Sequence, residues 1–209
     1  QQLRARIATA CQASGRNVQD VALLAVSKAF GPEAVREAFA AGQRAFGENY
    51  IQEAVEKMAA LADLSIEWHC IGPIQSNKTR LVATHFAWAH TVDRLKIAER
   101  LSAQRPGDLP PLQVCIQVNV DGGANKSGVT PGEALALARA VAALPRLKLR
   151  GLMAIPEPAP DFEAARAVHM RAKTIFDQLN VAGLGLDTLS LGMSADLEAA
   201  IAAGSTLVR

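Results

Sequence analysis

From residue 22 to its end, the sequence alternates between short apolar segments and longer amphipathic ones. The apolar segments predict eight strands, at residues 22–27, 44–47, 66–71, 87–91, 112–120, 148–154, 188–192 and 205–209. The amphipathic segments predict helices at 2–14, 32–41, 50–61, 77–83, 93–103, 130–143, 161–179 and 194–203. Strict alternation of strand and helix favours a parallel sheet. Eight strands predict an α/β fold, a single (β/α)8 TIM barrel with an extra N-terminal helix.

The length of 209 residues fits one domain, and we expect residues 1–209 to form it. The eighth predicted strand has no helix after it, so we expect this domain to lack its last C-terminal residues. The 22 basic and 20 acidic residues nearly balance and aromatic residues are 4% of the chain, which argues against a nucleic-acid partner.

Two further observations bear on where the protein works. No apolar run approaches the length of a membrane span, so we expect no membrane partner. The three cysteines lie far apart, without the spacing of a disulfide framework or a metal site, which is typical of a reducing compartment. We therefore predict a cytoplasmic protein without a metal.

Polar residues recur at the carboxyl ends of the predicted strands, where the active site of a (β/α)8 barrel lies. Lys28 follows the first strand, Asn49 the second and Ser194 the seventh, Arg209 ends the eighth, and His69 lies within the third. Each also has a simpler interpretation. The lysine could be a solvated charge, the histidine a core residue bonded to a carbonyl, and the asparagine and serine helix caps.

In combination these residues suggest chemistry. A lysine at the mouth of an apolar barrel would be partly desolvated, which would lower its pKa and free the amine to attack a carbonyl. Residues 192–194, "GMS", open a predicted helix whose N–H groups and hydroxyl would face an anion. A phosphorylated aldehyde needs both features. Pyridoxal 5′-phosphate (PLP) is such a molecule, but Schiff-base aldolases use the same pair, so the residues leave both possibilities open.

Six motifs resemble those of a known family. In chain order they are "LLAVSK", "FGENY", "WHCIGPIQSNK", "KSG", "RGLMAI" and "LSLGMSADLEAAIAAGSTLVR". They are similar to motifs of the pyridoxal phosphate homeostasis protein family, from about residue 23 to residue 209. The resemblance implies a barrel similar to the N-terminal domain of alanine racemase.

The resemblance also implies a cofactor and the residues that bind it. PLP would be held as a Schiff base on Lys28, while Ser194 and its neighbour Met193 would form part of the phosphate cradle. Arg209 would contact either the phosphate or the pyridine nitrogen. Asn49 would line the pocket, and His69 lies in the segment that passes beside it. The family pattern continues after "VR" with a Gly-Thr pair that this sequence does not contain.

The resemblance implies intracellular PLP homeostasis, meaning storage and delivery of the cofactor and buffering of the free aldehyde. A racemase of this fold needs a second base, a tyrosine from a separate domain, whereas this chain has one tyrosine, Tyr50. We therefore predict a non-catalytic PLP carrier, with no catalytic residues, that acts as a monomer and passes PLP to apo forms of PLP-dependent enzymes. The alternative is a weak PLP-dependent amino-acid racemase.

Overall fold

The computed structural model describes residues 1–123 and 127–209. The "KSG" motif begins at Lys126, so its first residue lies outside the described residues. The strands all run parallel in a single sheet. They are β1 (Ala22–Leu23), β2 (Ala25–Val26), β3 (Ala45–Glu48), β4 (Glu67–Cys70), β5 (Trp88–Val92), β6 (Leu112–Gln117), β7 (Leu147–Met153), β8 (Thr188–Ser190) and β9 (Leu207–Val208).

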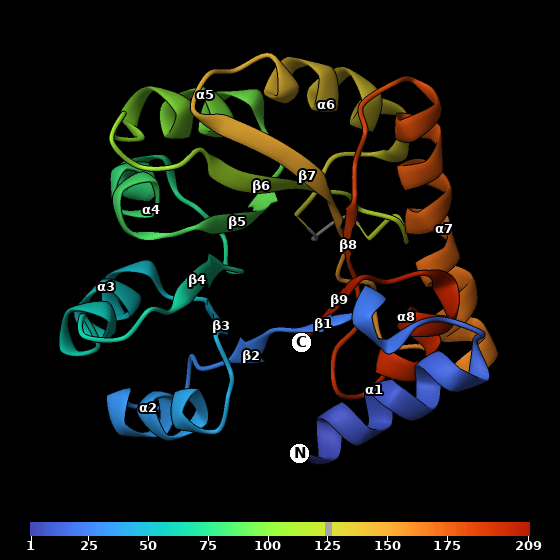
Figure 1. The fold of residues 1–209 in the computed structure, drawn as a ribbon. Coiled ribbons are helices and arrows are strands. Elements are labelled where there is room, and N and C mark those ends of the chain that lie inside the picture. The colour runs from blue at the N-terminus through green and yellow to red at the C-terminus, as the bar shows by residue number, and fades with distance from the viewer. Residues whose placement is uncertain (124–126) are drawn as a thin grey trace.

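Helices surround this sheet, and the N-terminal helix α1 lies beside α8 (Figure 1). Within the described residues the α-helices are α1 (Gln2–Ala13), α2 (Pro32–Ala40), α3 (Ile51–Ala60), α4 (Thr79–His85), α5 (Leu95–Gln104), α6 (Ala134–Ala142), α7 (Phe162–Val181) and α8 (Leu197–Ala203). Short 3₁₀ segments are η1 (Val18–Asp20), η2 (Ser76–Lys78) and η3 (Pro131–Glu133).

The barrel closes where the first predicted strand divides at Leu24. On one side β1 pairs with β9, and the Leu24 N–H donates to the Val208 carbonyl at 2.8 Å. On the other side β2 pairs with β3. The remaining strands follow one another around the sheet in chain order. The predicted (β/α)8 barrel and its extra N-terminal helix are therefore confirmed, with the first strand in two parts.

The core follows from the parallel sheet, whose strands are covered on both faces. All five residues of β5 are buried, and β6 is buried at five of its six positions. Ile97 and Leu101 of α5 belong to the same buried cluster as Val92 of β5. Inside the barrel, Trp88, Cys115 and Met153 form a smaller cluster. This core holds the carboxyl ends of the strands together at one mouth.

Several element boundaries shift by a few residues from the predictions, and for α5 a side-chain contact explains the shift. Helix α5 begins at Leu95 after Arg94, not at Asp93, whose Oδ2 instead accepts the Gly128 N–H at 3.0 Å. Strand β6 ends three residues early, at Gln117, where the chain departs from the regular ladder. Among the described residues, no helix has the length and apolar character needed to cross a bilayer.

Candidate functional site

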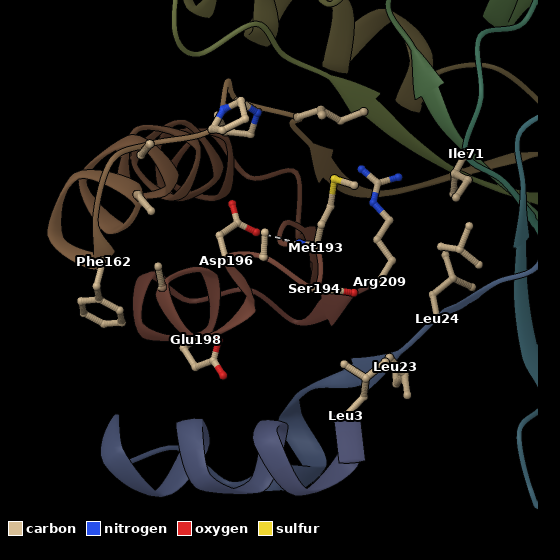
Figure 2. Close-up of a pocket in the computed structure, with 18 of the residues that line it drawn as sticks. Leu3, Leu23, Leu24, Ile71, Phe162, Met193, Ser194, Asp196, Glu198 and Arg209 are labelled. Atoms are coloured by element: carbon tan, nitrogen blue, oxygen red, sulfur yellow. Dashed lines mark hydrogen bonds between the residues drawn. The ribbon is translucent and has the colours of Figure 1, made fainter. Parts of the chain in front are cut away.

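A cavity of about 1150 Å³ opens at the carboxyl ends of the strands. Five of the residues singled out in the sequence line it: Lys28, Asn49, Met193, Ser194 and Arg209. Figure 2 shows this cavity with α1 along one side and the Arg209 side chain extending into it. The barrel thus brings together residues that are up to 181 positions apart, from Lys28 to Arg209.

Lys28 lies in a turn after β2, separated from the end of the strand by Ser27. The turn is closed by the Phe30 N–H, which donates to the Ser27 carbonyl at 3.0 Å. The Lys28 side chain lines the cavity but is exposed. The sequence predicted that this lysine is partly desolvated, and its exposure contradicts that prediction. Lys28 is therefore accessible from solvent as well as lining the cavity.

Asn49 follows β3 and does not cap the next helix, because the N-cap of α3 is Tyr50. Its Oδ1 atom is buried and has no hydrogen-bond partner among the described residues. The neighbouring loop packs closely here, since a Cβ at Gly72 would lie 2.1 Å from the Asn49 carbonyl oxygen. A buried acceptor without a partner is costly, so this oxygen is an unsatisfied polar atom on a residue that lines the cavity.

Arg209 brings a positive charge into the same cavity. Its Nη2 atom lies 3.3 Å from Met153 Sδ, and among the described residues no carboxylate lies within 4 Å of the guanidinium. Burial lowers the pKa of Arg209 to about 10, so the group stays charged at neutral pH. An unpaired guanidinium in such a place can receive an anion or a ring nitrogen.

The turn between β8 and α8 differs from the prediction. Helix α8 begins at Leu197 with Asp196 at its N-cap, so the prediction that the helix starts at Ser194 is wrong. Asp196 Oδ1 accepts the Met193 N–H at 2.8 Å, and its Oδ2 pairs with His169 Nε2 at 2.8 Å. The Met193 N–H is therefore already engaged, whereas the Ser194 hydroxyl has no partner within the described part of the chain.

Asp196 is ionised in this position. Burial raises the pKa of its carboxyl group, but hydrogen bonds from His169 and from the Met193 N–H outweigh that effect and hold the pKa below its usual value. The carboxylate therefore acts as the internal acceptor that shapes the turn. Gly192, at φ +100°, completes it, since a Cβ there would lie 2.6 Å from Ala200 Cβ.

Helix α1 supports this turn from outside, which the sequence did not reveal. Arg6 Nη2 donates to the Ser194 carbonyl at 2.7 Å, and Arg6 Nε donates to Glu198 Oε2 at 2.8 Å. Leu3 of the same helix lines the cavity. The extra N-terminal helix is thus part of the wall of the site.

His69 lies inside the barrel, and it is not among the described residues that line the cavity. Its Nε2 lies 2.7 Å from Glu67 Oε1, and its Nδ1 lies 2.8 Å from His90 Nε2. The chain continues from His90 Nδ1 to Ser190 Oγ at 3.1 Å. With Glu67 ionised, His69 donates to Glu67, His90 donates to His69, and Ser190 donates to His90.

The imidazoles of His69 and His90 are both neutral at neutral pH. Burial lowers the pKa of His69, against the opposing effect of Glu67, and burial lowers that of His90 well below its ordinary value. The sequence had suggested a backbone carbonyl as the partner of His69, and the structure places side chains there instead. Within the described residues, no group of three metal-ligating side chains forms a metal site.

Comparison with known proteins identifies close relatives. Residues 1–209 match the family described as alanine racemase, N-terminal domain. The pyridoxal phosphate homeostasis protein of Pseudomonas aeruginosa is 62% identical over 205 residues, which are 98% of this chain and 88% of that protein. The protein of the same name from Escherichia coli K12 is 53% identical over 211 residues, covering 100% of this chain and 90% of that protein.

Solved structures show the same fold. PipY of Synechococcus elongatus, a structure with PLP bound, aligns with a TM-score of 0.84 and 36% identity over 97% of this chain and 96% of that one. Alanine racemase from Corynebacterium glutamicum aligns with a TM-score of 0.72 and 18% identity, covering 99% of this chain and 58% of that one. The second likeness shows a shared barrel and nothing finer.

Proposed function

Because the chain belongs to the alanine racemase N-terminal-domain family, and within it to the pyridoxal phosphate homeostasis proteins, we propose that it binds PLP at the barrel mouth. We propose further that it serves PLP homeostasis inside the cell, by storing the cofactor, delivering it and limiting the free aldehyde. PipY, which was solved with PLP bound, supports the choice of ligand.

The observation that carries this proposal is the meeting of Lys28 and Arg209 in one cavity. PLP supplies an aldehyde carbon that a primary amine can attack. The Lys28 amine would add to that carbon and water would leave, so that a C=N bond joins the two. Arg209 would pair with an anionic or ring-nitrogen acceptor, the Ser194 hydroxyl would donate to the phosphate, and Asn49 Oδ1 would accept a hydrogen bond.

The same site supports a carrier more readily than an enzyme. Acid–base catalysis needs a second group within hydrogen-bond reach of the reacting atom. Tyr50, the one tyrosine of the chain, is 60% exposed at the start of α3, and it is not among the described residues that line the cavity. Lys28 is also open to solvent, which suits reversible loading and release. We therefore propose a non-catalytic, monomeric carrier in the cytoplasm whose partners are apo PLP-dependent enzymes.

Transfer to an apo-enzyme tests the carrier role. PLP-loaded protein, freed of excess ligand, is mixed with an apo-aminotransferase, and the recovery of aminotransferase activity is followed. We expect activation that saturates at one PLP per carrier chain. If loaded protein never activates the apo-enzyme, while free PLP at the same concentration does, the carrier role is wrong.

The racemase alternative is tested in the same preparation. Loaded protein is incubated with single L-amino acids, and the appearance of the D-enantiomer is measured by chiral chromatography. We expect no racemisation above that of free PLP. Rapid racemisation that is lost in Lys28→Ala would replace the carrier proposal with an enzymatic one.

A further inference from the structure

The strand that delivers Lys28 to the cavity is held by a short ladder. Strand β2 has two residues, which pair with Phe46 and Gly47 of β3, and the Ser27 N–H adds one bond to the Gly47 carbonyl at 3.0 Å. Its other neighbour in the barrel, β9, pairs with β1 and not with β2. Lys28 therefore emerges at the point where the barrel changes pairing partner and where few backbone bonds hold it.

A buried ion pair reinforces this point. Lys57 Nζ, from α3, donates to the Ser27 carbonyl at 2.7 Å and to Glu48 Oε2 at 2.9 Å. The Ser27 hydroxyl donates to the same carboxylate oxygen. Ser27, Glu48 and Lys57 are 4%, 1% and 5% exposed, so solvent does not compete for these bonds.

The stability of the fold does not account for this pair. Moving two charges out of water is costly, and replacing a buried ion pair by apolar side chains of similar size is often neutral or stabilising. The pair also leaves Glu48 Oε1 without a hydrogen-bond partner in the described part of the chain, which adds to its cost. The Glu48–Lys57 pair is costly and is bonded to Ser27, the residue before Lys28. We therefore look for its role in the placement of Lys28.

We propose that Lys57 and Glu48 are positioning residues for Lys28. Lys57 holds the Ser27 carbonyl, and Glu48 orients the Lys57 ammonium and the Ser27 hydroxyl. Together they fix the direction in which the chain leaves β2 and hence the place of the Lys28 amine in the cavity. This inference rests on the proposed reaction of Lys28 with PLP.

The decisive variant removes both charges together, as Glu48→Leu/Lys57→Met. Because neither charge is then left unpaired, we expect the thermal unfolding midpoint to stay close to that of the parent. The rate of covalent PLP attachment, followed by the visible absorbance of the C=N linkage, should fall about tenfold, which corresponds to about 1.4 kcal/mol in the barrier. Parent-like attachment in the folded double variant would overturn the proposal.

A second background separates positioning from general damage to the pocket. In Lys28→Ala, PLP can bind only without the covalent bond to Lys28, and its dissociation constant is measured by fluorescence quenching of the protein. If the pair acts through Lys28, adding the double substitution to Lys28→Ala should leave this constant unchanged. A similar loss of affinity in that background would show a merely structural role and overturn the proposal.

Two further variants complete the test. Glu48→Gln keeps the shape of the side chain and covers the case in which the double variant does not fold. We expect PLP attachment to be about threefold slower in this variant. Attachment at the parent rate would contradict the proposal. Asp187→Asn breaks the Arg150–Asp187 pair at the opposite end of the barrel and should leave attachment unchanged. If the parent itself forms no linkage that depends on Lys28, the proposed function fails, and this inference fails with it.

Discussion

At the scale of single residues, the buried Arg105 and the half-buried Arg209 show how differently one type of side chain can be used. Arg105 Nη1 donates to the carbonyls of Ala83 and Phe86 at 2.9 and 2.6 Å, so its charge is satisfied by the fold. Arg209 lines the cavity, and its Nη2 atom contacts the thioether sulfur of Met153. The first arginine stabilises the barrel through these bonds, whereas the second is, in our proposal, the one that pairs with the ligand.

Replacing these two arginines by methionine should therefore have opposite consequences. Arg105→Met leaves several carbonyls without donors and should lower the free energy of unfolding by about 2 kcal/mol or more. Arg209→Met removes an unpaired charge, so stability should be unchanged or higher, while PLP affinity falls about tenfold or more. Urea unfolding and PLP titration of both variants measure this. Parent-like PLP affinity in Arg209→Met would contradict the assignment.

The two buried histidines predict how stability depends on pH. Burial lowers the pKa of His69 and His90 in the folded state, so the unfolded chain binds more protons. Stability is then present at neutral pH and is lost as pH falls below about 6.5, by at most about 1.4 kcal/mol per pH unit for each histidine. Urea unfolding between pH 7 and pH 5 measures the loss before most carboxyl groups titrate. A stability profile that stays flat over this range would contradict the effect of burying these two histidines.

At the scale of elements, the first residue of α8 could not be predicted from the local sequence. Ser194 and Asp196 are both good N-cap residues, and the sequence favoured the first. The structure selects Asp196, whose carboxylate also contacts His169 on α7. That contact joins residues 27 positions apart, so no local pattern could have revealed it.

The turn before α8 should depend strongly on Gly192. A Cβ at this position would lie 2.6 Å from Ala200 Cβ, and the backbone φ is also positive. Gly192→Ala should therefore lower the free energy of unfolding by about 2 kcal/mol or more. Gly183 has a similar φ of +93° but open space around it, so Gly183→Ala should cost about 1 kcal/mol. Urea unfolding of both compares the two losses, and equal losses would mean that the close approach to α8 does not matter.

At the scale of the whole molecule, the barrel was predictable because its alternation is a property of the entire chain. Strand order, the N-terminal helix and the end of the barrel that carries the polar residues all follow from it. The extent of the domain remains a prediction. The Glu48–Lys57 pair was not recognised, although the sequence held a signal: Lys57 falls on the inward face of α3 with Ile51 and Ala54. A lysine at such a position needs a buried partner.

In the proposed function, Lys28 takes up PLP at the mouth of this barrel. The most direct test is to load the protein with PLP, reduce it with borohydride and locate the added mass by peptide mapping. We predict the modification on Lys28, at one per chain, with loss of the visible absorbance band in Lys28→Ala. Modification spread over other lysines, or an unchanged band in Lys28→Ala, would contradict the account.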